Sequence, residues 1–247
     1  MSDLGRYSRQ VVLPEVGVNG QAMLTDSCVL LIGMGALGSA AASCLAGAGV
    51  GHLMINDFDR LQVSNLHRQL LYRETDVGRC KVDAAKAQLG GLNAQLEITT
   101  LPQRLPPDAL QDAVRQADVV LDCSDNFPTR FAVNAACVAM RKPLVCGAAI
   151  RLEGQLCVFD LRHGGPCYAC LYPQTGEAAE RCEDAGILGP VSQVIGGLQA
   201  LAAIKLLIGI EQPIAQLQVW DALRMENRTL KLSSDPACGV CSGTKND

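Results

Sequence analysis

The sequence feature that most constrains the fold is a glycine-rich loop that directly follows an apolar strand. Residues 28–32 are apolar, and Gly33, Gly35 and Gly38 then form a G-x-G-x-x-G pattern. The first glycine permits a tight turn, the second lets the backbone approach a phosphate, and the third lets the following helix pack closely. That helix directs its free N–H groups towards the phosphates. The pattern predicts a nucleotide-binding strand–turn–helix unit.

An acidic residue strengthens this prediction. Asp57 ends the next apolar run, about 20 residues beyond the loop, where such folds place a carboxylate that binds ribose. The combination indicates an adenosine-containing ligand and does not separate ATP from NAD. The polar run that follows favours ATP, because a triphosphate needs cationic side chains and usually Mg²⁺. Arg68 and Lys81 could meet that need, although such residues are more often solvated surface charges.

A second carboxylate follows a later predicted strand. Asp125 comes shortly after the apolar run at 118–122, at the sheet edge where ligands bind in open α/β folds. It could serve Mg²⁺ or lie beside a phosphate. The run Asp125-Asn126-Phe127-Pro128 also suits the N-cap of a helix. The sequence leaves both readings open.

Strands and helices alternate through the first 150 residues. Strands are predicted at 28–32, 51–56, 96–99, 118–122 and 143–146, and helices at 20–24, 36–48, 81–90, 108–116 and 127–140. This alternation is typical of a Rossmann-like α/β fold with a doubly wound, mostly parallel sheet.

The pattern changes after residue 154. Three predicted strands, at 155–160, 216–221 and 229–232, flank one long helix at 189–209. They predict an added mixed or antiparallel section at the C-terminal side. We expect one domain over residues 1–247, with an N-terminal arm and helix (1–25), a nucleotide-binding part (26–150) and a C-terminal part (151–247).

Two Cys-x-x-Cys pairs, Cys167–Cys170 and Cys238–Cys241, stand far apart in the second half of the chain. Four thiolates fill all four positions around a tetrahedral Zn²⁺ ion and leave none open for water. We therefore expect a structural zinc knuckle that holds the C-terminal tail, whose loss loosens the tail and leaves phosphate chemistry unchanged. Free or redox-active thiols are the alternative. Most other cysteines stand singly in apolar runs and are expected to act as small hydrophobes.

Composition excludes several classes of function. The formal net charge of −4 offers no basic stripe for nucleic acid. The first residues lack a secretory signal, so we expect the chain in the reducing cytoplasm, with its cysteines not paired as disulfides. The most apolar stretch, 187–210, contains Pro190, Gln193 and Lys205 and is expected to be a buried helix rather than a membrane span.

The chain resembles the ubiquitin-activating-type adenylyltransferases that charge sulfur-carrier proteins, and the resemblance spans almost its whole length. The matching residues are Arg6-Tyr7-Ser8-Arg9-Gln10, the glycine loop, Asp57-Phe58-Asp59, Ser64-Asn65-Leu66-His67-Arg68-Gln69, Asp122-Cys123-Ser124-Asp125-Asn126 and both cysteine pairs. One departure is His67, where the family more often has Gln. The resemblance implies ATP and Mg²⁺ in the nucleotide site, Zn²⁺ in the cysteine cluster and a ubiquitin-like sulfur carrier as partner.

The resemblance also implies roles for the residues that would hold ATP. Asp57 would bind the ribose, and Asn65 and Gln69 would line the same pocket. Arg68 and Lys81 would hold the phosphates.

Further roles concern the reaction and the partners. Asp125 would serve Mg²⁺ and the reacting α-phosphate, and Arg9 would reach into the site of a neighbouring subunit in a homodimer. Residues 151–247 would bind the carrier. Cys182 matches a cysteine that links covalently to the carrier in thiazole-pathway members, but its charged surroundings favour a loop cysteine without that role.

The implied reaction is attack of the carrier's C-terminal glycine carboxylate on the α-phosphate of ATP, giving an acyl-adenylate and pyrophosphate. Residues 147–155 favour the molybdopterin-pathway carrier (MoaD type), whereas 111–122 and 189–191 resemble enzymes for the thiazole-pathway carrier (ThiS type). An NAD-dependent oxidoreductase would leave Arg68, Lys81 and the cysteine pairs unexplained. A non-catalytic carrier-binding scaffold and a dehydratase acting on tRNA are further alternatives.

Overall fold

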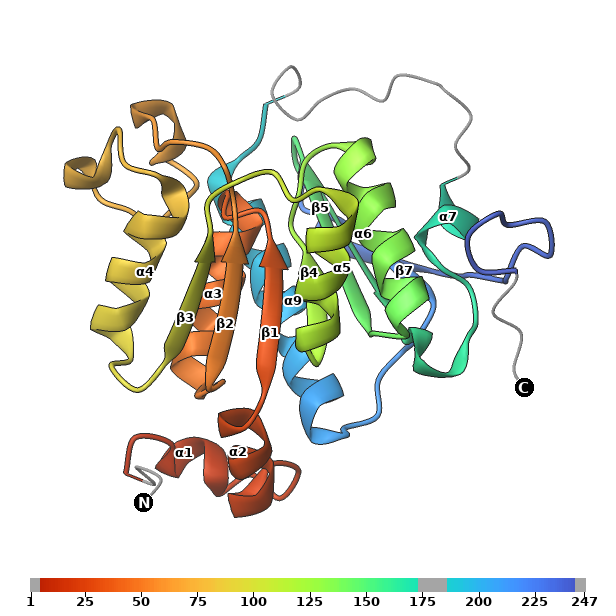
Figure 1. Cartoon of the computed structure of the whole chain (residues 1–247), viewed down its shortest axis with the longest axis horizontal. Coiled ribbons are helices and arrows are strands. Elements are labelled where there is room, and N and C mark those ends of the chain that lie inside the picture. Colours follow the sequence, from red (N-terminus) through yellow and green to blue (C-terminus); the bar gives the residue numbers. More distant parts are fainter. Residues whose placement is uncertain (1–4, 173–185, 243–247) are drawn as a thin grey trace.

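The computed structural model describes residues 5–172 and 186–242 of the chain. Its centre is a sheet of eight strands in the order β3-β2-β1-β4-β5-β6-β7-β8 (Figure 1). The strands are β1 (Cys28–Ile32), β2 (His52–Asn56), β3 (Glu97–Leu101), β4 (Val119–Asp122), β5 (Leu144–Ile150), β6 (Glu153–Phe159), β7 (Gln216–Asp221) and β8 (Glu226–Lys231).

The helices in the described part are α1 (Ser8–Val11), α2 (Gly17–Thr25), α3 (Ala36–Ala48), α4 (Lys81–Leu92), α5 (Pro107–Gln116), α6 (Phe127–Met140), α7 (Tyr168–Leu171) and α9 (Gly189–Ile208). Short 3₁₀ turns cover Val63–Asn65, Glu74–Asp76 and Leu161–His163. The ranges predicted for β1, α3, α6 and β7 match the structure, and α1 and α7, each of four residues, were not predicted.

Strand direction divides the sheet into two halves. The strands β1 to β5 are mutually parallel, and β1 lies between β2 and β4. β5 then pairs antiparallel with β6, which begins a meander through β7 to β8. The predicted Rossmann-like sheet with an antiparallel addition is therefore confirmed. The order reverses between β1 and β4, where open α/β sheets bind ligands at the carboxyl ends of the strands.

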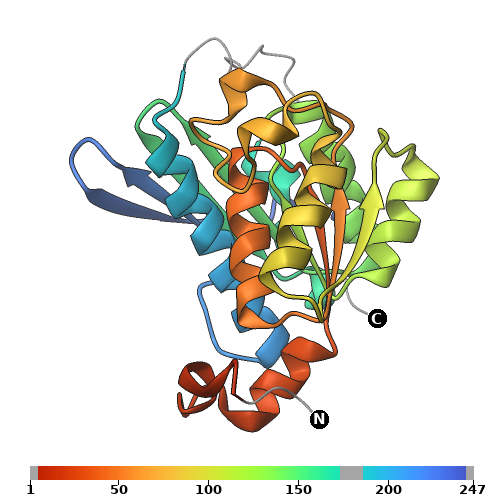
Figure 2. The same cartoon turned by 90° about the vertical axis from the view of Figure 1, so that its left-hand side faces the viewer.

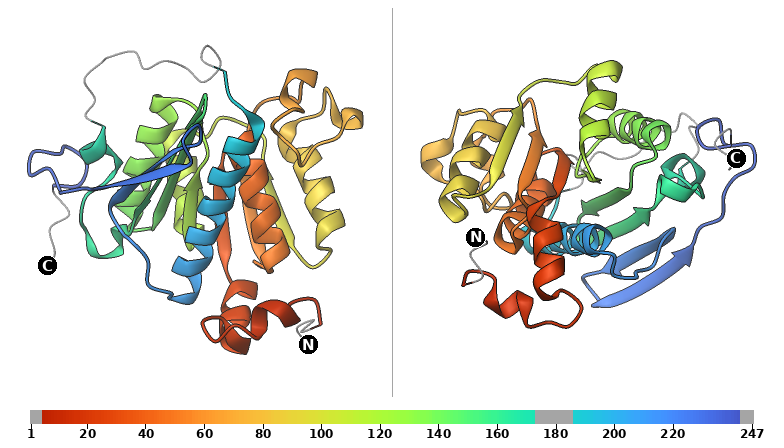
Figure 3. Two further views of the ribbon diagram at one scale, coloured as in Figure 1. Left: turned by 180° about the vertical axis from the view of Figure 1, so that it is seen from behind. Right: turned by 60° about the horizontal axis from the view of Figure 1, so that its bottom comes forward.

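Helices cover both faces of the sheet and enclose two apolar cores (Figure 3). Successive side chains of a strand point to opposite faces, so in β1 Leu31 packs with α3, α4 and α9, whereas Leu30 packs with α5 and α6. The second core ends at Phe159, Tyr168 and the cysteine pairs. The fold thus places the cysteines at the end of one core and not in a separate module.

The long helix α9 packs against α3 through small residues. A Cβ atom added at Gly196 would lie 2.5 Å from the carbonyl oxygen of Leu37, so only glycine permits this approach. By length and composition alone α9 could cross a membrane, although 44% of its apolar window is buried inside the molecule. Its buried residues, including Val191, Ile195 and Ala203, belong to the core of the sheet.

The arm formed by α1 and α2 lies at the amino ends of the parallel strands, away from their carboxyl ends (Figures 1 and 2). Tyr7 is buried there, and its hydroxyl accepts a hydrogen bond from Asn93 Nδ2 at 3.1 Å. The ring lies so close to Gly49 that a Cβ atom there would approach it to 2.6 Å. Gln10 Nε2 donates to Ala48 O at 2.9 Å and ties α1 to the end of α3.

Candidate nucleotide pocket and metal centre

A cavity of about 630 Å³ opens at the carboxyl ends of the parallel strands, where the strand order reverses between β1 and β4. The predicted site residues that line it are Gly33, Gly35, Asp57, Asn65, Arg68, Gln69, Lys81 and Asp125. These residues come from four separate segments of the chain. The structure therefore brings these eight predicted residues together in one pocket.

The glycine loop is held by close backbone contacts. Gly33 has φ = +92°, and a Cβ atom there would lie 2.9 Å from Cys123 O on the neighbouring strand connection. At Gly38 a Cβ atom would lie 1.9 Å from Gly33 O, so the third glycine allows the helix to pack on the loop. At Gly35 the nearest atom is Gln69 Nε2, 3.7 Å away on the pocket side. Gly33 therefore adopts a backbone conformation that favours glycine, and Gly38 allows close packing, as predicted for the first and third glycines. The phosphate contact predicted for Gly35 stays a prediction.

The Asp57 carboxylate is held in place by two backbone N–H groups. Its Oδ2 accepts from Met34 N in the glycine loop, and its Oδ1 accepts from Asp59 N, both at 2.8 Å. Burial raises the pKa of this carboxyl, and Lys81 and the two N–H groups partly oppose that rise. Because it is already oriented, this carboxylate can accept hydrogen bonds from the hydroxyl groups of a ribose without rearrangement.

Lys81 begins α4 and is buried at the edge of the pocket. Its Nζ lies 2.8 Å from Asp59 Oδ2 and 3.9 Å from Asp57 Oδ2. The two carboxylates hold the ammonium in place before any ligand binds. A phosphate placed beside it would meet a positive charge whose position the protein already fixes.

The turn after Asp59 supplies the other predicted polar groups. Asn65 Oδ1 accepts from Gln62 N at 3.0 Å, which closes a 3₁₀ turn that presents Arg68 to the pocket. Arg68 Nη1 donates to Ser64 O at 2.9 Å and lies 2.8 Å from His67 Nε2. His67, where the family more often has Gln, therefore contacts Arg68, the residue predicted to hold the phosphates.

Gln69 reaches the pocket from the same turn and is only 3% exposed. Its Oε1 is buried without a hydrogen-bond partner among the described residues. Buried polar atoms are nearly always paired in folded proteins, so this oxygen is suited to accept from a bound ligand.

The structure excludes one of the two readings of Asp125, the N-cap of α6. The N-cap of α6 is Asn126, whose Oδ1 accepts from Thr129 N at 3.0 Å. Asp125 is exposed in the pocket, and its Oδ1 lies 3.4 Å from Asn126 Nδ2. Its carboxylate is therefore available to a cation or a phosphate-bound metal.

Sequence reasoning missed Arg130, which lines the pocket from the first turns of α6. Its Nη2 donates to Ser124 O and to Gly147 O, the latter at 2.9 Å, and its Nη1 lies 4.0 Å from Asp122 Oδ2. Burial alone would lower the pKa of Arg130, but the Asp122 carboxylate, together with Tyr168 and the neighbouring cysteines, outweighs burial and raises the pKa. Arg130 thus connects the segment after β4 to the middle of β5 at the pocket. The signal was an arginine within a largely apolar helix.

Two predicted site residues in the described part of the chain, Gly38 and Arg9, do not line the pocket. Arg9 is exposed on α1, on the arm at the amino ends of the strands, and does not line the cavity of its own chain. Cys182 lies outside the described residues.

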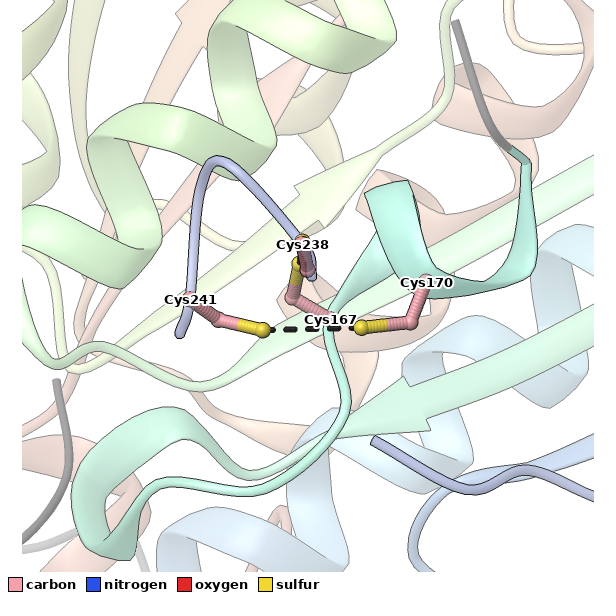
Figure 4. A group of neighbouring side chains, drawn as sticks. All are labelled: Cys167, Cys170, Cys238 and Cys241. Atoms are coloured by element: carbon pink, nitrogen blue, oxygen red, sulfur yellow. Dashed lines mark hydrogen bonds between the residues drawn. The ribbon is translucent and has the colours of Figure 1, made fainter. Parts of the chain in front are cut away.

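The four paired cysteines converge at the far end of the second core (Figure 4). All four Sγ atoms lie within 4.8 Å of one another. The separations are 3.8 Å between Cys167 Sγ and Cys238 Sγ and 3.5 Å between Cys170 Sγ and Cys241 Sγ. A tetrahedral Zn²⁺ ion with bonds of about 2.3 Å places its sulfurs about 3.8 Å apart. The cluster therefore fits zinc in ligand type, number and spacing.

The backbone of the second pair favours the thiolate form. Burial opposes ionisation of the Cys238 thiol, but the N–H groups of Cys241 and Val240, together with the thiols of Cys241 and Cys167, outweigh burial and lower the pKa to about 7. Burial raises the pKa of Cys167, with Asn134 opposing that rise. A metal ligand must be a thiolate, so the knuckle backbone prepares one ligand before metal binds.

Comparison with known proteins decides the family. A model of the ThiF family matches residues 7–240. The chain belongs to the ThiF family. The match covers the arm, the nucleotide pocket and three of the four clustered cysteines, so the resemblance in the sequence motifs is confirmed.

Two relatives of this ThiF-family chain match it over nearly their whole lengths. The sulfur carrier protein ThiS adenylyltransferase of Escherichia coli is 46% identical, covering 99% of this chain and 98% of its own. The molybdopterin-synthase adenylyltransferase of Salmonella typhimurium is 44% identical, covering 96% and 95%. A crystal structure of E. coli MccB with ATP is 24% identical with a TM-score of 0.83, covering 96% of this chain and 74% of that one. The last likeness shows the shared fold.

Proposed function

We propose that this ThiF-family chain is an adenylyltransferase that uses ATP to activate the C-terminal glycine of a ubiquitin-like sulfur-carrier protein. The observation that carries this proposal is the pocket, which joins a ribose-type carboxylate, Asp57, to the cations Lys81 and Arg68 and to Asp125. An oxidoreductase that binds NAD has no need of these additional charges. Relatives named adenylyltransferases, 44–46% identical over almost the whole chain, support the same activity.

The geometry supports a displacement at phosphorus. A glycine carboxylate oxygen forms a bond to the α-phosphorus, and the bond from that phosphorus to the bridging oxygen of pyrophosphate breaks. Lys81 and Arg68 stabilise the charge that develops on the phosphates. Asp125 offers oxygen ligands of the kind that Mg²⁺ prefers, and a bound Mg²⁺ would neutralise phosphate charge. No nucleophilic side chain is needed, so positioning and electrostatics supply the catalysis.

The proposal includes a homodimer in which Arg9 acts in the partner's pocket. Arg9 is exposed on an arm at the opposite end of the sheet from its own pocket. The same arm exposes the apolar side chains Val12, Leu13 and Val18. Apolar side chains gathered on an exposed arm favour contact with another protein surface. In a symmetric homodimer that contact would bring Arg9 of each subunit to the pocket of its partner.

The proposal treats residues 1–247 as one domain. Hydrogen bonds run without interruption from β3 to β8, so the parts 26–150 and 151–247 share a sheet. The cysteine cluster would hold structural Zn²⁺ and fix the tail beyond β8 to α7. Cys182 remains the candidate for a covalent link to the carrier. Such an enzyme would act in the cytoplasm.

Two carriers fit this reaction. Residues 147–155 favour a MoaD-type carrier of the molybdopterin pathway, and we retain it as the first candidate. The ThiS-type carrier is the alternative, favoured by Gly189-Pro190-Val191 at the start of α9 and by the relative of 46% identity.

ATP–pyrophosphate exchange with purified protein, Mg²⁺ and each carrier separately tests the proposal. We expect exchange that depends on a carrier, and the carrier that supports it names the pathway. Asp125→Ala should reduce exchange by about 10²–10³-fold, the usual effect of removing one charge-stabilising group. The control Asp108→Ala removes an exposed carboxylate outside the pocket and should leave exchange unchanged. Binding of both carriers without exchange would indicate a scaffold.

A further inference from the structure

Helix α6 is largely apolar, yet it buries two polar side chains one turn apart. Arg130 faces the nucleotide pocket, and Asn134 lies 0% exposed beneath the cysteine cluster. Asn134 Nδ2 lies 3.5 Å from Cys167 Sγ, and Asn134 Oδ1 accepts from Tyr168 N at 2.9 Å. Both ends of one buried amide therefore contact the first Cys-x-x-Cys pair.

The orientation of this amide is fixed by its neighbours. A backbone N–H group can only donate, so the atom of Asn134 that faces Tyr168 N must be the carbonyl oxygen. The amide nitrogen then faces Cys167 Sγ and donates to it. Cys167 is itself fully buried, where an unpaired thiolate would be costly.

Metal binding strengthens this contact. Four thiolates around one Zn²⁺ carry a net charge of −2, and that charge remains in a site largely shielded from water. Hydrogen bonds to a charged acceptor are about twice as strong as those to a neutral one. Asp235 N lies 3.4 Å from Cys170 Sγ and serves the second sulfur of the pair in the same way.

We propose that Asn134 is an outer-sphere ligand of the zinc centre, whose N–H···S hydrogen bond to Cys167 retains the metal. This inference rests on the proposed zinc centre and is independent of the adenylation reaction. The competing explanation is that Asn134 only caps α7 by accepting from Tyr168 N. The two explanations differ in which end of the amide matters.

The variant Asn134→Asp separates them, because it keeps the acceptor for Tyr168 N and removes the donor to Cys167. Asn93→Asp is the matched control. Asn93 is also buried, donates to Tyr7 Oη and Ala46 O, accepts from Gln95 N and lies far from the cluster. The readouts are zinc release to a chromophoric chelator and the thiolate-to-metal charge-transfer band of the cobalt-substituted protein.

We expect Asn134→Asp to release zinc about 10- to 100-fold faster than the wild type, the usual cost of losing an outer-shell partner. Its cobalt band should shift, and Asn93→Asp should match the wild type in both measurements. Wild-type release and an unshifted band in Asn134→Asp would overturn the proposal and leave the zinc centre intact. A wild-type protein that takes up no zinc would overturn it as well, whereas its ATP–pyrophosphate exchange would still report on adenylation.

A measurement on the wild type covers the case in which Asn134→Asp does not fold. Substitution with cadmium-113 and labelling of asparagine with nitrogen-15 allow scalar coupling to be detected across an N–H···S bond. Coupling between the metal and the Asn134 side-chain amide would support the proposal. An assigned Asn134 amide without such coupling, beside a coupled backbone N–H of Asp235, would contradict it.

Discussion

The nucleotide pocket and the cysteine cluster are assembled in different ways. In the pocket, Asp57 is held by two backbone N–H groups, and Lys81 is held by Asp59. In the cluster, Cys167 and Cys238 approach across 71 residues of sequence, and the connection between them includes the exposed strand β8. The pocket is organised by the sheet, whereas the cluster joins a tail to it.

The charges show the same contrast. The pocket pairs the Lys81 ammonium with the Asp59 carboxylate, so this charged pair is stabilised without a ligand. The cluster brings four sulfurs within 4.8 Å, and their thiolate forms repel one another unless a cation lies between them. We infer that the pocket keeps its shape when empty and that the tail depends on its metal.

The largest expected effect on stability comes from the glycine loop, where two glycines should respond differently to substitution by alanine. Gly38→Ala places a Cβ atom 1.9 Å from Gly33 O, a backbone atom that cannot move aside. We expect it to lower the free energy of unfolding by at least about 4 kcal/mol, as for other severe core clashes. Gly35→Ala meets only a side-chain nitrogen at 3.7 Å, so stability should be nearly unchanged.

Gly35→Ala should nevertheless weaken ATP binding by about 100-fold, because its methyl group occupies the space that the phosphates need. Urea unfolding and calorimetric titration of ATP measure the two effects. If both variants were equally unstable, the loop would be a purely structural element and the assigned roles of its glycines would be wrong.

The next largest effect is that of removing the metal. If the pocket also depends on the metal, the contrast between the pocket and the cysteine cluster is wrong. Chelation of zinc should remove about 2.7 kcal/mol of stability where free zinc had been 100 times its dissociation constant. Limited proteolysis with mass spectrometry should show new cuts between β8 and Cys241, because the tail loses its attachment. ATP affinity should stay the same. A parallel loss of ATP binding would mean that α6 transmits the state of the cluster to the pocket.

Local patterns predicted the elements that carry their own signals. The apolar run into three glycines defined β1, the loop and α3, and two Cys-x-x-Cys pairs defined the cluster. Asp57, Arg68, Lys81 and Asp125 all line one pocket because the carboxyl ends of parallel strands meet at one edge. The structure brings these groups together, and measurements on the variants will test the roles assigned to them.

Other features could not be predicted because their cause is tertiary. Asp125 and Asn126 are both residue types that favour an N-cap, so the sequence alone does not say which of them caps α6. The backbone conformation of the folded chain gives that position to Asn126. Arg130 and Asn134 have partners on distant segments, at Gly147 and Cys167. No spacing rule relates positions on a helix to a strand end or a knuckle elsewhere in the chain. Buried polar residues in an apolar helix signal that such partners exist without naming them.

The smallest expected effect concerns pH and tests how far the pocket is organised by charge. Burial raises the pKa of Asp57, and Lys81 lowers it, so Lys81→Met should raise it further. A carboxyl whose pKa is raised by folding contributes stability below its unfolded pKa of about 3.9 and loses that contribution as pH rises through the folded value. From acidic to neutral pH, the free energy of unfolding of Lys81→Met should therefore fall by about 1–2 kcal/mol more than that of the wild type.

ATP affinity of Lys81→Met should also begin to fall at a higher pH on acidification, because protonated Asp57 no longer accepts both ribose hydroxyls. Urea unfolding and ATP titration at several pH values measure these effects. Lys86→Met removes an exposed lysine from the same helix and should follow the wild-type curves. Identical pH profiles for the two variants would show that the backbone N–H groups of Met34 and Asp59, without the ammonium, keep Asp57 ionised.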